Sequence, residues 1–515
     1  MASLHRFLGS LVLLALVFSV IHFPTAEGGG SSDVMVGGDK ITVFESDDPN
    51  YEYPAKNINV KDRGTLFINS TAKVKVDQTA DWQYSVVVEG FGTLHLNGGV
   101  LFSNYDVRME IKGHATLVLE NRASIEVTDF SASEQCSIFI GSGCTIEAVN
   151  MSVSCAQLNV SSSTLSDRTV QSAGELNILD ETLFNLTVKE AGSVFVDSAK
   201  LAGASFGSVS GNMVFEDTTV EESFVGKCNG LVFGKGEEKG DSGCVITNLD
   251  AGEVSTAVVK HSTVQGLTLE ECSRFEMKSC EFMGEQSELD ALTEIPVFLA
   301  ETSSFADLTL KFDANEEVTL KRISDARLEL SGDGVLDVYG WTPTEKSEDG
   351  EQHTDGISVT GDGTVNVHRY LTVAVQDKDG KPVPEAAVKV LDTPDHAVVD
   401  EKKTDEDGKA TFTLLGTIIS RGDGGNLEEP VWFYRLDVTF DDKSSATDIQ
   451  MPDDLSKVID LDTVVEEEDE GLSATQWGMI AGALVLVVII FWLMASKAGK
   501  KRKREPESGR KGRKR

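Results

Sequence analysis

The most constraining feature of this 515-residue sequence is a short motif that recurs along its first half, in which two apolar residues flank a third residue. Early copies lie at residues 94–96 and 117–119, and later copies at residues 176–178 and 194–196. The first residues of successive copies are separated by 23, 21 and 20 positions and then by 18, 18, 19 and 18 positions. A period of about twenty residues is typical of stacked repeats, each of which buries its apolar side chains against its neighbours.

Each copy of the motif continues with a polar step and then a further apolar residue. Residues 160–165 and 178–183 share this shape, and residues 259–264 return to it after a polar insertion near residues 234–243. The pattern predicts three short strands joined by polar bends in every unit. When units stack, their inward residues should form columns, and Ser, Thr, Cys and Asn at equivalent bends should form ladders of similar residues.

The period and the columns resemble those of the right-handed parallel β-helix family over residues 36–368. The resemblance implies a rod on the order of 70 Å long, since coils stack at about 4.8 Å. Two alternatives remain at this point. A leucine-rich repeat has a similar period, but its Leu-x-x-Leu-x-Leu-x-x-Asn string is absent. An array of β-sandwiches would instead show turn signals every 8–12 residues or so.

A second segment, residues 369–462, has a different sequence pattern. Leu371 begins an alternating strand, and Asp377–Gly380 and Asp405–Gly408 form Asp-x-Asp-Gly sequences. The segment resembles the carboxypeptidase regulatory-like, transthyretin-like β-sandwich, which implies a small non-catalytic module. Calcium is the one cofactor that these sequences bring into consideration. Neither completes a calcium-binding loop, so we interpret both as tight turns, and we predict no metal or other cofactor site.

Both ends of the chain predict export and anchoring. Residues 1–26 have the features of a signal peptide, with an uncleaved anchor as the alternative. Residues 477–495 carry no charge and are long enough to span a bilayer. An acidic linker at residues 463–476 precedes this predicted helix, and a basic tail at residues 496–515 follows it. The positive-inside rule therefore predicts a single-pass plasma-membrane protein with its C-terminus in the cytoplasm. Within the span, Gly478 and Gly482 have the spacing of a helix-dimer motif, so a homodimer is a hypothesis.

The charge of the chain is divided unevenly along it. The tail after Ser496 has eleven basic and two acidic residues, so the preceding 496 residues carry a formal charge of −47, against −38 for the whole chain. An exterior this acidic repels nucleic acid, which we exclude as a partner. The membrane is the predicted partner of the C-terminal region. For the ectodomain the partner classes left open are polysaccharides and surface proteins.

Cysteines and glycosylation sequons give the candidate modification sites. All seven cysteines lie in the middle of the chain, and no CxxC pair is present, which disfavours zinc. Cys136 and Cys155 are 19 positions apart, close to one coil, so a disulfide between them is one hypothesis and buried free thiols are the other. Four sequons fit a glycosylated exterior: Asn69, Asn150, Asn159 and Asn185.

Two functions remain open for this all-β chain with one predicted transmembrane helix. The first is a non-catalytic ectodomain for envelope structure, adhesion or binding, because no catalytic residue can be assigned. The second is a membrane-tethered polysaccharide lyase or glycoside hydrolase, since parallel β-helices host such enzymes; convergent acidic and basic side chains on adjacent coils would support it. The architecture as a whole is similar to that of archaeal envelope proteins.

Overall fold

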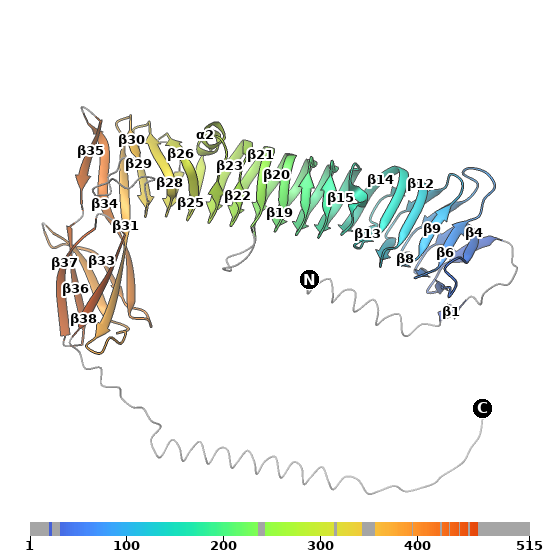
Figure 1. Cartoon of the computed structure of the whole chain (residues 1–515), viewed down its shortest axis with the longest axis horizontal. Coiled ribbons are helices and arrows are strands. Elements are labelled where there is room, and N and C mark those ends of the chain that lie inside the picture. Colours follow the sequence, from blue (N-terminus) through green and yellow to red (C-terminus); the bar gives the residue numbers. More distant parts are fainter. Residues whose placement is uncertain are drawn as a thin grey trace, which may run out of the picture.

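The computed structural model describes residues 20–22, 31–234, 243–313, 317–341, 356–393, 395–422, 425–431, 433–441, 443–451 and 454–461. Within these ranges the chain is all-β apart from one α-helix and one 3-10 turn, and it forms a β-solenoid of about 14 turns. Figure 1 shows the solenoid as a long rod with a second group of strands at its C-terminal end. The predicted all-β class and the parallel β-helix are therefore confirmed.

Strands of the solenoid pair in parallel with strands of the next coil, so the coils stack as the repeat predicts. In the N-terminal third the strands are β1 (Val20–His22), β2 (Ser32–Val36), β3 (Ile41–Phe44), β4 (Glu52–Val60), β5 (Thr65–Asn69), β6 (Lys73–Val76), β7 (Ser85–Val88), β8 (Thr93–Asn97), β9 (Val100–Ser103), β10 (Arg108–Ile111), β11 (Thr116–Glu120), β12 (Ser124–Ala132) and β13 (Ser137–Ile140). The middle coils contain β14 (Thr145–Val160), the 3-10 turn η1 (Ser163–Leu165), β15 (Thr169–Leu179), β16 (Thr182–Phe184), β17 (Thr187–Asp197), β18 (Lys200–Ala202), β19 (Ser205–Glu216), β20 (Thr219–Phe233), β21 (Val245–Lys260), β22 (Thr263–Val264) and β23 (Leu267–Lys278). The last coils contain β24 (Glu281–Phe282), α2 (Gln286–Thr293), β25 (Val297–Glu301), β26 (Ser304–Phe312), β27 (Glu317–Lys321), β28 (Ser324–Leu330), β29 (Val335–Tyr339), β30 (Ile357–Val359) and the first half of β31 (Thr364–Asp377).

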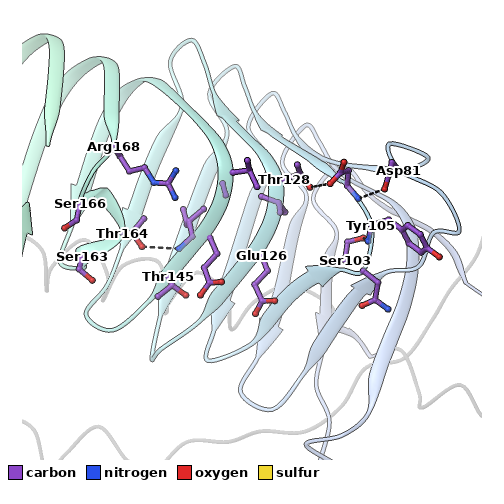
Figure 2. Close-up of a pocket in the computed structure, with 17 residues that line it drawn as sticks. Asp81, Ser103, Tyr105, Glu126, Thr128, Thr145, Ser163, Thr164, Ser166 and Arg168 are labelled. Atoms are coloured by element: carbon purple, nitrogen blue, oxygen red, sulfur yellow. Dashed lines mark hydrogen bonds between the residues drawn. The ribbon is translucent and has the colours of Figure 1, made fainter. Parts of the chain in front are cut away.

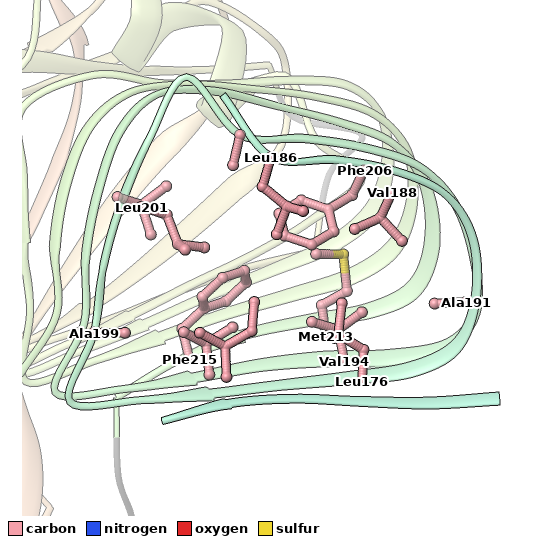
Figure 3. Packing of buried hydrophobic residues seen from close by; sticks show 14 of the residues in the cluster. Leu176, Leu186, Val188, Ala191, Val194, Ala199, Leu201, Phe206, Met213 and Phe215 are labelled. Atoms are coloured by element: carbon pink, nitrogen blue, oxygen red, sulfur yellow. The ribbon is translucent and has the colours of Figure 1, made fainter. Parts of the chain in front are cut away.

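The first residue of each motif points inward and lies directly on the equivalent residue of the next coil. Leu158 pairs with Leu176, Leu176 with Val194, and Val194 with Met213. All four side chains are at most 1% exposed, and Figure 3 shows Leu176, Val194 and Met213 in one column. Burying each such side chain contributes about 2 kcal/mol, and the column repeats that gain at every coil. The predicted inward columns are confirmed.

Left-handed residues turn the chain at one corner of each coil. Asp180, Ser198 and His261 have φ values of 55°, 54° and 50°. The backbone N–H of each donates to a carbonyl one coil further on, as Asp180 does to Asp197 (3.0 Å). A positive φ suits short polar residues, because their side chains tolerate the left-handed region better than branched ones do. The polar bends of the repeat are therefore the positions at which the chain changes direction.

Directly after this corner lies a column of small, buried polar side chains. The hydroxyl of Ser262 donates to the carbonyl of Lys260 (2.6 Å) and accepts from the backbone N–H of Cys244 (3.0 Å). The hydroxyl of Ser303 similarly donates to Glu301 (3.0 Å) and accepts from the N–H of Cys280 (3.2 Å). These hydroxyls satisfy backbone groups inside the rod that would otherwise be costly to bury. Stacked Ser, Thr and Cys residues at the bends are thus observed, as the sequence predicts.

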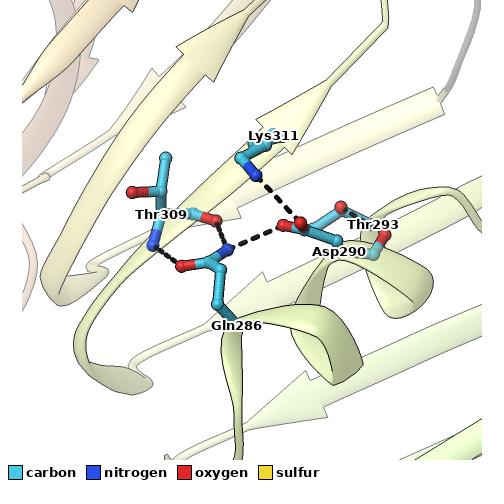
Figure 4. Close-up of polar contacts among 5 residues, drawn as sticks. All are labelled: Gln286, Asp290, Thr293, Thr309 and Lys311. Atoms are coloured by element: carbon cyan, nitrogen blue, oxygen red, sulfur yellow. Dashed lines mark hydrogen bonds and ion pairs between the residues drawn. The ribbon is translucent and has the colours of Figure 1, made fainter.

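One coil contains a helix, which the repeat pattern does not predict. Helix α2 begins with a capping box between Glu285 and Glu288 and buries its two leucines, Leu289 and Leu292, against the solenoid. Gln286 bonds to both the N–H (2.8 Å) and the carbonyl (2.7 Å) of Thr309, as a strand residue would. Figure 4 shows this side chain bridging the helix and β26. The helix therefore takes the place of a strand between β23 and β26.

The C-terminal end of the rod continues into a second body without a break in the chain. The first half of β31 pairs with β29 of the last coil, and its second half pairs with β38 (Leu455–Leu461). The long strand β34 (Lys409–Gly422) runs antiparallel to β31 over both halves. The predicted boundary between residues 368 and 369 lies inside β31, so the two bodies share strands.

A second sheet faces the far halves of these strands. It contains β32 (Ala387–Asp392), β33 (Val398–Lys403), β36 (Phe433–Phe440) and β37 (Lys443–Gln450). A separate hydrophobic core lies between the two sheets and includes Val373, Phe412, Val388 and Leu436. Each of these side chains is fully buried, so this body has a core of its own.

An antiparallel hairpin covers the open end of the solenoid. β34 pairs with the solenoid half of β31, and β35 (Gly425–Pro430) pairs with β34. β35 is exposed and ends with Glu428, Glu429 and Pro430. Charge and proline on an edge strand discourage addition of a further strand, so this hairpin ends the parallel stack.

Three predicted segments lie outside the described residues: the acidic linker at residues 463–476, the transmembrane helix at residues 477–495 and the basic tail at residues 496–515. In the part of the chain that is described, no helix is long and apolar enough to cross a membrane. The predicted signal peptide, residues 1–26, is described only at β1, which pairs in parallel with β3. Export and anchoring stay predictions.

Candidate functional site

A polar groove crosses five neighbouring coils of the N-terminal half and has a volume of about 790 Å³. Figure 2 shows its side chains along the outer surface of the rod. The groove is lined by Asp81, Ser103, Asn104, Tyr105, Asp106, Glu126, Val127, Thr128, Thr145, Ile146, Glu147, Ala148, Val149, Ser163, Thr164, Ser166 and Arg168. Hydroxyls, carboxylates and an amide predominate, so the surface can donate and accept many hydrogen bonds.

Alternation along β12 and β14 places the central polar residues of the groove. Ile125 and Val127 point into the core, so Glu126 between them points outward. β12 and β14 are adjacent parallel strands in which Glu126 pairs with Glu147. Directly opposite residues on such strands lie about 4.8 Å apart at the backbone. The two carboxylates therefore occupy the same face of adjacent coils.

One wall of the groove is held by a buried glutamine. Gln78 is 5% exposed, and its side-chain N–H groups donate to the hydroxyl of Ser103 (3.0 Å) and the carbonyl of Asp106 (2.9 Å). The carboxylate of Asp106 accepts from the hydroxyl of Thr128 (3.0 Å), and that of Asp81 accepts from the N–H of Asp106 (3.1 Å). Asp81 and Asp106 therefore shape the wall of the groove.

Two exposed aromatic rings stand at this wall. Tyr105, which lines the groove, is 45% exposed, and Trp82, next to Asp81, is 47% exposed. The guanidinium of Arg108 lies 5.7 Å from the centre of the Trp82 ring, within the range of a cation–π interaction. Exposed aromatic rings beside convergent polar groups are typical of a binding surface.

The balance of charged side chains in the groove bears on the ligands that it could bind. Among the described residues, neither Glu126 nor Glu147 forms an ion pair, and Arg168 forms none either. The groove also contains Asp81 and Asp106, so it has more negative than positive charge. Its chemistry favours neutral, hydroxyl-rich ligands over anionic ones.

Sequence reasoning did not single out Trp82, Tyr105 or Gln78. A signal was nevertheless present: the first motif residues Leu66 and Leu94 are paired in space through β5 and β8, yet they are 28 positions apart. The additional residues form the loop that carries Trp82 and Asp81. A coil longer than the period therefore marks the position of the groove.

The four sequons occupy different environments. Asn150 is exposed beside the groove residue Val149, and its side-chain N–H donates to Asp129 (2.8 Å). Asn185 is exposed at a corner and donates to Asp167 (2.8 Å). Asn69 is half-buried at the end of β5. The side-chain oxygen of Asn159 accepts a hydrogen bond from the side-chain N–H of Asn177 (2.6 Å), and the amide nitrogen of Asn159 is buried. The geometry favours attachment of a glycan at Asn150 and Asn185.

Six of the seven cysteines are buried, and Cys272 is half-buried. Cys136 and Cys155 are close to each other in the interior of adjacent coils. A hydrogen bond from the Cys155 thiol lowers the pKa of Cys136, whereas this interaction and burial raise the pKa of Cys155. The two residues are thus neighbours, as the spacing predicts, and the disulfide stays a prediction.

The two Asp-x-Asp-Gly sequences are tight turns. Asp377 accepts from the backbone N–H groups of Asp379 and Lys381 (both 2.9 Å). Asp405 accepts in the same way from Asp407 (3.0 Å) and Lys409 (2.9 Å). Within the described residues, no group of three or more His, Cys, Asp or Glu side chains could hold a metal ion. The turn interpretation accounts for the hydrogen-bond pattern that the two sequences share.

The fold and the groove together define a parallel β-solenoid with a polar groove on the outer surface of its N-terminal coils. No protein-family model matches the chain, and no curated protein matches it. Any function must therefore be argued from the site itself.

Proposed function

We propose that this chain is a cell-surface protein whose β-helical ectodomain binds a neutral polysaccharide through the groove, without catalysis. The observation that carries the proposal is the exposed ring of Tyr105 in the groove beside a row of Ser and Thr hydroxyls, with exposed Trp82 at the edge, where its backbone N–H donates to the carbonyl of the lining residue Asp106 (2.8 Å). Sugar rings have apolar faces that stack on aromatic side chains and hydroxyls that need hydrogen-bond partners at their edges. A groove across several coils suits a ligand that extends along the rod.

Charge supports a neutral ligand. The formal charge of the whole chain is −38, and the groove itself has excess carboxylates. An anionic polymer would be repelled by both, whereas neutral hydroxyls can donate to Glu126 and Glu147.

The finer features of the architecture belong to the same proposal. We assign a right-handed coil to the solenoid, by its resemblance to that β-helix family. The two-sheet body after β31 is then a carboxypeptidase regulatory-like β-sandwich that acts as a spacer. A cleaved signal peptide and a helix at residues 477–495 would present the rod outside the cell, as in archaeal envelope proteins.

Binding can be tested with aromatic variants of the full chain. Trp82→Ala or Tyr105→Ala should weaken binding of neutral glucose, mannose or N-acetylglucosamine oligosaccharides by about 3- to 10-fold, because an aromatic contact contributes about 0.5–1.5 kcal/mol. Titration calorimetry measures the change. Phe91→Ala is the matched control, since Phe91 is 62% exposed but outside the groove. Equal affinity of Tyr105→Ala, which changes the ring inside the groove, and Phe91→Ala would contradict the proposal.

A second candidate is a glycoside hydrolase that uses the same groove. It is favoured by one observation, the pairing of Glu126 with Glu147 on adjacent strands, because retaining glycosidases use two carboxyl groups about 5–5.5 Å apart. Incubation with the same oligosaccharides distinguishes the two candidates. Release of shorter products that disappears in Glu126→Gln and Glu147→Gln would establish hydrolysis, and intact oligosaccharide with retained binding supports the first candidate.

A further inference from the structure

A second hollow lies where the last coils of the rod join the C-terminal body, at the other end of the rod from the groove (Figure 1). It has a volume of about 490 Å³, and its lining residues come from β27, β29, β31 and β34. They are Val318, Thr319, Lys321, Asp337, Tyr339, Tyr370 and Thr413. We call this hollow the junction pocket.

The wall of the junction pocket is held by contacts around Asp337. Its carboxylate oxygen Oδ1 accepts hydrogen bonds from the side chains of Asn366 (3.0 Å) and His368 (2.8 Å). The ring of His368 in turn stacks on the ring of Tyr339, with 4.6 Å between ring centres. Protein contacts therefore hold the ring of Tyr339 in place independently of a ligand.

The two tyrosine rings of the pocket have protein groups over their faces. Tyr339 lies between His368 on β31 and Lys321 on β27, whose ammonium is 5.9 Å from the centre of the ring. The guanidinium of Arg322 is 4.8 Å from the centre of the Tyr370 ring. These faces are less available for stacking on a sugar, so the tyrosines offer a ligand mainly their hydroxyl groups.

Hydroxyl donors predominate around the pocket. Burial raises the pKa of Tyr339 and of Tyr370 above the ordinary value, so both hydroxyls stay protonated at neutral and mildly alkaline pH. Thr319 and Thr413 add two more hydroxyls to the lining. Four groups that can each donate a hydrogen bond therefore surround one space.

The charge of Lys321 has no counter-ion. Among the described residues it forms no ion pair, and its register neighbour Glu301 pairs with Lys278 instead (3.7 Å). The one carboxylate of the lining, Asp337, is already bonded through Oδ1. Charges farther away than about 8–10 Å are largely screened at physiological salt, so the acidity of the whole chain does not cancel this local cation. A cation among hydroxyl donors suits an anionic group.

We propose that the junction pocket binds a monosaccharide unit that carries one anionic group, a carboxylate or a phosphate. The anionic group is placed at Lys321 among the hydroxyls, and the second carboxylate oxygen of Asp337 accepts a hydrogen bond from a sugar hydroxyl. The volume of about 490 Å³ accommodates a whole sugar unit rather than only a small ion. This site is separate from the groove and does not depend on the groove binding a neutral polysaccharide.

Titration calorimetry of the full chain in detergent tests the site with three matched sugars. Glucuronate and glucose 6-phosphate carry the two anionic groups, and glucose is the neutral counterpart. At least one of the anionic sugars should bind ten or more times as tightly as glucose, because a hydrogen bond to a charged group is worth about tenfold or more in affinity. The tighter of the two identifies the anionic group, and equal affinity for all three sugars would overturn the proposal.

Variants locate the bound sugar. Lys321→Gln should weaken binding of the anionic sugar at least tenfold, whereas Lys227→Gln, at an exposed lysine of β20, is the matched control. Tyr339→Phe and Tyr370→Phe keep the rings but remove the hydroxyls, and each should weaken binding about 3- to 10-fold. Tyr105→Ala, in the groove, should leave it unchanged.

Three results would contradict the site. The first is an effect of Lys321→Gln no larger than that of Lys227→Gln. The second is a loss of binding in Tyr105→Ala, which would place the anionic sugar in the groove. The third is inorganic phosphate binding as tightly as the anionic sugar, which would show that the sugar ring makes no contact.

Discussion

At the scale of single residues, the backbone conformation at the corners determines which side chains the repeat accepts. Ser198 has a φ of 54°, and its hydroxyl donates to the carboxylate of Asp197 (3.0 Å). The left-handed backbone at this corner therefore restricts the residue type that the position accepts. The sequence shows these positions as polar bends, but their left-handed conformation becomes visible only in the folded chain.

Substitutions at Ser198 should show whether this corner depends on the left-handed backbone conformation or on the serine hydroxyl. Ser198→Val should destabilise the chain by about 1–2 kcal/mol, because a branched side chain resists the left-handed region. Ser198→Gly should be nearly neutral, since glycine adopts a positive φ readily. Urea denaturation followed by circular dichroism measures both. A loss in Ser198→Gly as large as that in Ser198→Val would show that the corner requires the hydroxyl rather than the conformation.

Glycan occupancy is a second test at the residue scale. Asn150 and Asn185 should be occupied in protein from a glycosylating host, because both are exposed, whereas Asn159 should be unoccupied in the folded chain because its amide nitrogen is buried. Site-resolved mass spectrometry reports the fraction at each site. A fully occupied Asn159 would mean that the Asn159–Asn177 ladder does not form.

At the scale of elements, the repeat predicts strands and inward columns well, because the alternation and the period are local and regular. It could not predict α2, since the additional residues between Phe275 and Phe298 only lengthen one step of the period. It could not predict the groove either. Gln78 holds that wall through bonds to residues 25 and 28 positions away, which no local pattern records. The shared strands β31 and β34 likewise depend on pairing between distant segments.

The inward columns should dominate stability. Phe215 is 1% exposed and stacks on Phe233 with 4.7 Å between ring centres. Phe215→Ala should therefore cost about 3–5 kcal/mol in the free energy of unfolding. Phe184→Ala, the same change at a ring that is 50% exposed, should cost well under half as much. Guanidinium denaturation compares them, and similar losses would contradict the column packing.

At the scale of the whole molecule, stacking gives a rod with the polar groove on the outer surface of its N-terminal coils. Because each coil contacts mainly its neighbours, a ligand on the N-terminal coils should leave the distant coils unchanged. The hairpin of β34 and β35 ends the stack and joins it to the C-terminal body, so the rod presents the groove far from that end.

Hydrogen–deuterium exchange of the full chain with and without a bound neutral oligosaccharide tests the central claim most directly. Slower exchange should appear in the segments that line the groove, at residues 81, 103–106, 126–128, 145–149 and 163–168, and the strands from β25 onward should exchange as before. Protection confined to the C-terminal body, or to the coils from β25 onward, would contradict the assignment of the groove as the binding site.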